Sequence, residues 1–375
     1  MEVIGTVAAF LGVLVVLVLV HELGHFIVAK RAGITVEEFG IGFPPRITSV
    51  TWHGTRYSLN WIPLGGFVRM LGEDGDVEVR RLREQGLTDD EVEHAMAGAF
   101  NRRPIWVRLG VLLAGVAMNF VLAAGLFAVA LSLPALIGHG PLTVIEVQEN
   151  SPADGKLQVD DVIVAADGRT FDRSADLTEY VRGKATHVVT LTVVRGGEES
   201  DIRIIPRPVT EEQRANGIGP VGFSYEPQRL VEEPSTVTGP LDAIGRGTGA
   251  AWTLATRIPG GLLDAVGGLI GLNPDAGEAR GPIGIAQETG RVLEAPLVSQ
   301  LLFVGVLSVN LAVLNVLPFP PLDGGRIAVV LLESARRRKL PAEREALIYL
   351  TGFAVLMALI ILISIQDIQR LITGG

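Results

Sequence analysis

The chain has 375 residues, of which 48% are hydrophobic and only 19% are charged, and its mean hydropathy is +0.39. This composition excludes an ordinary soluble protein and indicates a membrane protein. The net charge of −9 gives no indication of a nucleic-acid partner. There is no cysteine, which excludes disulfides and thiolate ligands, so any metal ion would need His, Asp or Glu.

Four apolar stretches are long enough to cross a bilayer, which requires about 20 apolar residues in a helix. We predict transmembrane helices over residues 1–30, 105–137, 297–332 and 345–372. Because helices satisfy their own backbone hydrogen bonds in lipid, the expected fold class is a mainly α-helical polytopic membrane protein.

Basic residues near the ends of the predicted spans indicate their orientation. They gather directly after the first span, directly before the second, and between the third and fourth in "SARRRKLPAER". All three sites fall on one side of the membrane if the N-terminus faces out. We therefore expect residues 30–105 and 333–345 in the cytoplasm and the long segment 138–296 outside.

The cytoplasmic segment 31–104 divides into two parts. Residues 36–70 alternate apolar and polar side chains around Gly54 and "PLGG", which is typical of strands joined by turns. Residues 73–100 are charged and are expected to be helical. We predict a membrane-associated β-hairpin region followed by a helical segment.

The outer segment also divides into two parts. Residues 138–208 contain β-rich runs such as "DVIVAAD" and "HVVTLTVVRGG", with one helix expected near 174–183, which favours a small inserted α/β domain. Residues 209–296 are rich in Gly and Pro, and the apolar stretch 250–271 is interrupted by both. We interpret 209–296 as an extracytoplasmic or interfacial linker.

The motif "HELGH" covers residues 21–25 at the end of the first span. His21 and His25 lie on one helix face, about 6 Å apart along the axis, and can bind one zinc ion. Glu22 lies roughly 100° round the helix, where it can accept a proton from the attacking water. The alternative is a pair of structural histidines near the headgroups. Ionisable groups are costly in a membrane and usually functional there, which favours the metal site.

A third ligand is expected, because catalytic zinc sites usually have three protein ligands and one open position. Asp323 lies in "NVLPFPPLDGGR", residues 315–326, at the end of the third span. That end reaches the same leaflet as the end of the first span, so Asp323 and HELGH are expected at similar depth. The alternative is that "PLDGG" is only a turn where the helix leaves the membrane.

The prolines before Asp323 break the helix and would expose backbone groups beside the zinc. Asn315, upstream of the break, could donate to an oxyanion. Its alternative role is a hydrogen bond between helices. The same alternative applies to Asn119 in "AGVAMNF" on the second span, where Gly115 permits close packing.

These motifs together resemble the site-2 protease family of intramembrane zinc metalloproteases, and in particular the bacterial regulator-of-sigma-E protease type. "HELGH" and "NVLPFPPLDGGR" match its two metal-binding motifs, and "LLAGVAMNF" and "GPIGI" are similar to further family segments. The resemblance covers nearly the whole chain. It implies that His21, His25 and Asp323 bind Zn²⁺, that Glu22 is the catalytic base, and that Asn315 is catalytic through the oxyanion or the substrate.

The inserted domain resembles a PDZ domain. "NSPADGKLQVDDVIVAADGRTF" is similar to a characteristic PDZ stretch, although "DGKLQVDD" departs from the usual pattern. The departure weakens the prediction that the usual groove binds a peptide tail. Many relatives carry two PDZ domains, whereas this chain has room for one.

The expected function is that of an intramembrane zinc metalloendopeptidase in the bacterial inner membrane. It would cleave transmembrane segments of membrane proteins in regulated intramembrane proteolysis, such as anti-sigma factors or remnant signal peptides. Its partners would be these substrates and the lipid bilayer. The active site would lie toward the cytoplasmic leaflet, with the N-terminus and the PDZ domain outside. A metal transporter and an inert anchor for a scaffolding PDZ domain are the alternatives. A transporter would place polar residues across the whole bilayer, and an anchor has no use for Glu22.

Overall fold

The computed structural model describes residues 2–73, 77–209, 219–269, 281–338 and 340–373. The chain forms two compact units. The helical unit comprises Met1–Leu131, Thr238–Gly260 and Ala279–Gly375. The inserted unit comprises Ser132–Val237 and Gly261–Glu278. Each unit is described by itself.

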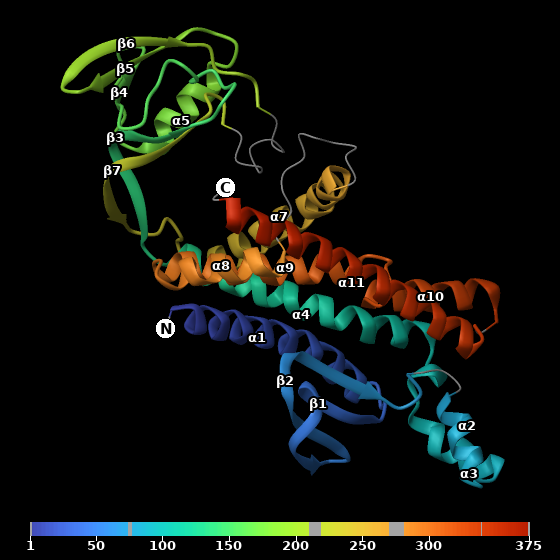
Figure 1. Cartoon of the computed structure of the whole chain (residues 1–375). Coiled ribbons are helices and arrows are strands. Elements are labelled where there is room, and N and C mark those ends of the chain that lie inside the picture. Colours follow the sequence, from blue (N-terminus) through green and yellow to red (C-terminus); the bar gives the residue numbers. More distant parts are fainter. Residues whose placement is uncertain (1, 74–76, 210–218, 270–280, 339, 374–375) are drawn as a thin grey trace. The chain divides into compact units, whose positions relative to one another are not determined.

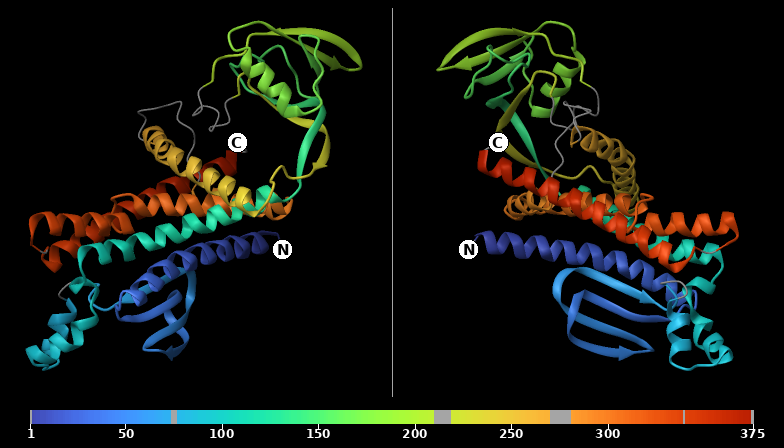
Figure 2. Two further views of the ribbon diagram at one scale, coloured as in Figure 1. Left: turned by 180° about the vertical axis from the view of Figure 1, so that it is seen from behind. Right: turned by 45° about the vertical axis from the view of Figure 1, so that its right-hand side comes forward.

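Within the described residues, four helices are long and apolar enough to cross a membrane. They are α1 (Glu2–Arg31), α4 (Ile105–Ser132), α9 (Leu297–Val316) and α11 (Ala342–Thr373). The predicted fold class is thereby confirmed. In Figures 1 and 2, α4 runs alongside α1. Buried residues of α4 also pack against α9 and α7 (Pro240–Leu269), so α4 is the central helix of this unit.

The predicted third span is divided by its prolines. Helix α9 ends at Val316, and α10 (Asp323–Arg336) begins after the irregular segment 317–322. Proline lacks the N–H that would continue the helix, which explains the break. The second span is shorter than predicted, since α4 ends at Ser132, two residues before Pro134.

The region between α1 and α4 contains two long strands, β1 (Val36–Trp52) and β2 (Thr55–Met70). Each strand folds back on itself, so that Ile41 pairs with both Leu59 and Gly66. The two strands thus provide four antiparallel runs, with 66–70 at one edge. Phe26 of α1 packs edge-on against Phe39, which attaches the sheet to α1. The helical segment that follows contains α2 (Val77–Glu84), α3 (Asp89–Ala95), and the 3₁₀ helices Met96–Gly98 and Phe100–Arg102.

The inserted unit contains a five-stranded sheet with strand order β6-β5-β4-β3-β7, and the helix α5 packs against this sheet (Figure 1). Leu177 and Val181 of α5 pack with Leu191 and Val193 of the sheet in its buried core. This is the α/β type of domain that the sequence predicts. The elements are β3 (Ala135–Val147), β4 (Val162–Ala166), α5 (Ser174–Gly183), β5 (Val189–Arg195), β6 (Glu198–Ile204) and β7 (Phe223–Glu233).

The predicted linker 209–296 is more ordered than the sequence indicates. Strand β7 lies beyond the predicted domain end at residue 208, yet it pairs along β3 from Ala135 to Val147. The rest of the linker contains α7 and α8 (Pro282–Leu293). The apolar residues of α7 are spaced at helical intervals, so this helix forms although it contains a proline, Pro259. The parts of this predicted linker at 210–218 and 270–280 lie outside the described residues.

Candidate metal centre

The structure brings the three predicted metal ligands together. His21 Nε2 lies 2.8 Å from Asp323 Oδ2, and His25 Nε2 lies 3.2 Å from the same oxygen. The two histidine Nε2 atoms are 3.1 Å apart. The two histidines are one helical turn apart on α1, and Asp323 is the first residue of α10. The break after α9 therefore delivers a carboxylate to the histidine pair from a distant part of the sequence.

The spacing of these atoms fits zinc. Ligand atoms about 2.0–2.1 Å from a tetrahedral zinc ion lie roughly 3.3 Å from one another. The three observed separations are close to that value, and all candidate ligand atoms of the group lie within 4.8 Å of one another. Both histidines are only 6% exposed and the Asp323 side chain only 14%, so a carboxylate charge there would be costly without a cation beside it. Two imidazoles and one carboxylate form a donor set that zinc prefers.

The second nitrogen of His25 is held by backbone. His25 Nδ1 donates to the carbonyl of Val111 on α4 at 2.8 Å. This contact fixes the proton on Nδ1 and leaves Nε2 with a lone pair for the metal, which is the usual arrangement around a zinc-bound histidine. Val111 has no feature in the sequence that would predict this role, because the contact uses its backbone alone.

Asn119 contacts the other histidine. Its fully buried side-chain amide lies 3.3 Å from His21 Nδ1, and Ser308 donates to its backbone carbonyl. In the described part of the chain, Oδ1 of Asn119 has no hydrogen-bond partner. A half-turn of the amide would let Oδ1 accept the Nδ1 proton of His21 and leave Nε2 for the metal. The unsatisfied oxygen therefore also fits a zinc-binding histidine.

Two glycines allow α1 and α4 to approach closely at this point. A Cβ atom on Gly24 would lie 2.3 Å from the carbonyl oxygen of Ala114. A Cβ atom on Gly115 would lie 2.4 Å from His25 Nε2 and 2.8 Å from His21 Cε1. Glycine at residue 115 thus leaves the space that both imidazoles occupy.

We expect Gly115→Ala to lower zinc affinity by about 10–100-fold, the range observed when the surroundings of metal ligands are disturbed. The added methyl group would displace the imidazole of His25. Gly125→Ala on the same helix is the matched control, since nothing lies within 4 Å of a Cβ atom there. Competition with a zinc chelator measures both affinities. Equal affinities for the two variants would contradict this account.

The metal ligands line a cavity of about 810 Å³. Glu22 and Asn315 also line it, so all five residues predicted for the site border one space. Glu22 is only partly buried, which leaves its carboxylate accessible from the cavity. Most residues of the run 65–70 of β2 line the cavity as well. This run lies close to the predicted base, since a Cβ atom on Gly66 would be 3.6 Å from Glu22 Cγ.

Comparisons with known proteins agree with this geometry. The profile of peptidase family M50 matches residues 9–359. A protein of Clostridium perfringens (strain 13 / Type A) is 34% identical over 353 residues, which cover 94% of this chain and 95% of that protein. Regulator of sigma-W protease RasP of Bacillus subtilis (strain 168) is 28% identical over 432 residues, covering 98% of this chain and 99% of that protein.

Among solved structures, the PDZ domain of the SdrC-like protein from Listeria innocua is similar to part of the chain. The match covers 25% of this chain and 99% of that domain, with 22% identity and a TM-score of 0.21. The family assignment depends on the match over residues 9–359 and on the cluster of His21, His25 and Asp323. The chain therefore belongs to peptidase family M50, and it is a multi-pass membrane protein and a zinc metalloprotease.

Proposed function

We propose that the protein is an intramembrane endopeptidase that cleaves transmembrane segments of other membrane proteins. The observation that supports this most directly is the place of the cluster. His21 and His25 lie within a helix long and apolar enough to span a membrane, and Asp323 follows another such helix. The cavity beside them is about 810 Å³, which is large enough for several residues of an extended peptide.

The proposed chemistry divides between the metal and the chain. When bound by His21, His25 and Asp323, zinc supplies Lewis-acid polarisation of a carbonyl and lowers the pKa of water. Glu22 accepts the proton of the attacking water and transfers it to the leaving amine. Asn315 donates a hydrogen bond to the substrate oxygen that gains charge. No covalent acyl-enzyme is needed.

The edge of β2 provides a place for the substrate backbone. In the part of the chain that the structure describes, residues 66–70 pair with β1 alone. All of them except Arg69 also line the cavity. A peptide in extended form can add to such an edge through main-chain hydrogen bonds. Because carbonyls in a helix are already hydrogen-bonded, the substrate helix must unwind before it binds here.

The substrates that we propose are membrane-anchored anti-sigma factors and remnant signal peptides. The relative from Bacillus subtilis is named as a regulator of sigma-W protease, which supports the first class. The site would act on single transmembrane segments in either case, since the edge of β2 can pair with one added strand.

We further propose that the N-terminus faces out, that the metal centre lies toward the cytoplasmic leaflet of the bacterial inner membrane, and that the inserted domain is extracytoplasmic. The basic residues in the last turn of α1 and those directly before α4 support this orientation. Reporter fusions near residues 75 and 340 are expected to give a cytoplasmic signal, and one near residue 190 an extracytoplasmic signal. A cytoplasmic signal near residue 190 would reverse the orientation.

The decisive experiment is cleavage of a labelled transmembrane segment by the purified protein in lipid nanodiscs. We expect cleavage that stops when a chelator removes zinc and returns when zinc is added back. The same substrate without its apolar segment should remain uncut. Cleavage that a chelator does not affect would contradict the proposed function.

A further inference from the structure

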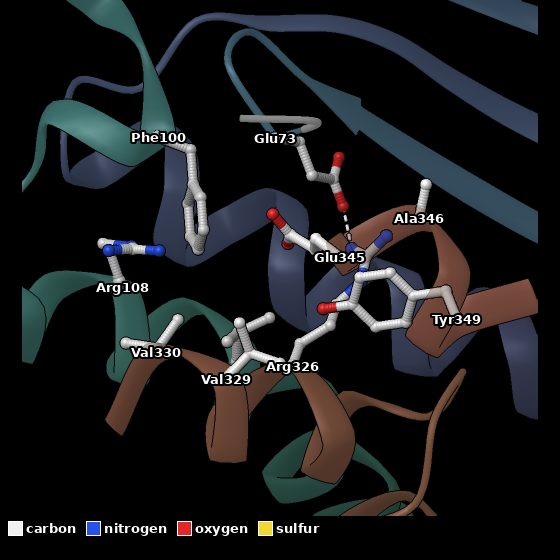
Figure 3. A pocket seen from close by; sticks show the side chains of 10 residues that line it. Glu73, Phe100, Arg108, Arg326, Val329, Val330, Glu345, Ala346 and Tyr349 are labelled. Carbon is white, nitrogen blue, oxygen red and sulfur yellow. Dashed lines mark hydrogen bonds and ion pairs between the residues drawn. The ribbon is translucent and has the colours of Figure 1, made fainter. Parts of the chain in front are cut away.

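The ion pair between Glu73 and Arg326 connects the β-sheet to the helix that carries a metal ligand. Arg326 is on α10, three residues after Asp323, and Glu73 follows the end of β2 by three residues. The two side chains come from segments 253 residues apart in the sequence (Figure 3). Because three residues are almost one helical turn, Arg326 and the metal ligand Asp323 project from the same face of α10.

The carboxylate of Glu73 makes two contacts at once. One oxygen accepts from Arg326, and the other accepts the backbone N–H of Met70 at 3.1 Å. Met70 is the last residue of β2, whose run 66–70 borders the metal cavity. Glu73 therefore connects Arg326, three residues after Asp323 on α10, to the end of the edge strand.

This ion pair is partly shielded from water. Only 13% of the Glu73 side chain is exposed, against 37% of the Arg326 side chain, whose guanidinium lies 6.0 Å from the ring centre of Tyr349 on α11. Charged hydrogen bonds shielded from water are worth more than exposed pairs. Figure 3 shows Glu73, Arg326 and Tyr349 converging on the same space from three different elements.

Breaking the pair would leave room for movement. Glu73 and Arg326 line the metal cavity and also a second cavity of about 310 Å³ (Figure 3). A guanidinium released from Glu73 could turn into that space, and Glu73 would lose the charged partner that helps to hold its carboxylate against the backbone of Met70. Val68 and Met70 also lie in a buried core, so the ion pair acts together with that packing to fix the strand edge.

We infer that the Glu73–Arg326 ion pair is a positioning element that fixes the β2 edge against the metal centre and thereby determines which peptide bond is cut. The inference rests on the proposed addition of the substrate to residues 66–70. A peptide held on a strand edge can shift only in steps of about two residues without turning its side chains to the opposite face. A loosened edge would therefore permit cleavage about two residues away from the normal bond.

The test compares Glu73→Gln and Arg326→Gln with the full-length wild-type protein in nanodiscs. We expect both variants to retain zinc at the wild-type ratio and to lose about 10–100-fold in kcat, which is typical of a small misplacement of substrate. Mass spectrometry of the products should show additional cuts about two residues from the wild-type position. Arg326→Lys keeps the charge and should retain mainly the wild-type cut.

Glu333→Gln is the matched control. It removes the ion pair of Glu333 with Arg108, 3.4 Å long, which also joins α10 to another element but does not border the metal cavity. Its cleavage position and kcat should stay within about twofold of wild type, because neither Glu333 nor Arg108 borders the metal cavity. Additional cuts in this control equal to those of Glu73→Gln would overturn the inference.

Hydrogen exchange provides a measurement that does not depend on turnover. The amides of residues 66–70 should exchange at least about tenfold faster in Glu73→Gln than in wild type or Glu333→Gln, as a strand edge opens locally. Unchanged exchange, a single cut at the wild-type bond, or a loss of activity that merely follows loss of zinc would overturn the inference. Wild-type protein that cuts no transmembrane segment would instead reject the proposed function, and the exchange result would still decide the role of the ion pair.

Discussion

Replacing Glu22 with glutamine is expected to lower kcat for a transmembrane substrate by about 10²–10⁴-fold, the usual contribution of a general base. The amide has nearly the same shape as the carboxylate but cannot accept the proton. Because Glu22 is outside the ligand cluster, the variant should retain zinc at the wild-type ratio. Metal analysis and single-turnover cleavage of the same preparation measure both quantities.

Two results would change the role of Glu22. Turnover near the wild-type rate in the zinc-loaded Glu22→Gln variant would exclude Glu22 as the base. Loss of zinc from this variant would instead make Glu22 a ligand. Glu37→Gln is a suitable control, since Glu37 is an exposed carboxylate on β1 and does not line the metal cavity.

The metal centre could be predicted from sequence because each of its ligands lies in a short motif that can be identified locally. His21 and His25 are fixed on one face by helical periodicity, and Asp323 stands out as a carboxylate after an apolar helix. To predict that the histidines and Asp323 lie close together, one further inference is needed: the ends of the first and third spans must lie in the same leaflet. The structure places all three ligand groups within hydrogen-bonding distance, so that step was sufficient.

The sheet beside α1 could be predicted only in part. Alternation in 36–70 indicates strands, but it does not show that β1 and β2 each fold back to give four runs. Alternation of apolar and polar residues shows which side chains face the same side of a sheet. It does not show which run lies next to which, because a shift of the pairing by two residues leaves the pattern unchanged. The edge run 66–70, which borders the metal cavity, was therefore not evident from sequence.

In the inserted domain, two strands could not be predicted from local sequence. Strand β6 reads "EESDIRI", and most of its residues are exposed, so it lacks the apolar character that marks a strand. It forms because it pairs with β5 at the edge of the sheet, where polar side chains face water. Strand β7 is separated from the rest by more than a dozen residues, and its partner β3 lies far back in the sequence. Long-range pairing of this kind leaves no local pattern.

The contacts around the ligands were the least predictable part. The carbonyl of Val111 and the arginine at residue 326 act on the site through positions fixed only by tertiary packing. For Asn119, the sequence predicts a hydrogen bond between helices as one alternative. The structure gives that bond a specific partner, His21 on α1.

Asp323→Ala should lose both zinc and activity, because it removes the only carboxylate in the ligand cluster of the described residues. Two imidazoles would remain, with neither a third protein ligand nor a negative charge. We expect zinc affinity to fall by more than about 100-fold, beyond the effect of changing the surroundings of a ligand. Asp323→Asn keeps the shape of the side chain and should show whether the charge itself is required.

The fold should survive this change, which makes the result interpretable. Asp323 also lies at the N-terminus of α10, but an acidic residue there contributes only about 0.3–1 kcal/mol to helix stability. Loss of zinc should therefore exceed any loss of folded protein measured by thermal unfolding. His25→Ala should behave like Asp323→Ala, whereas His53→Ala should retain zinc, since His53 is outside the cluster. If Asp323→Ala keeps its full zinc content, the turn before α10 is purely structural and the third ligand must be another residue.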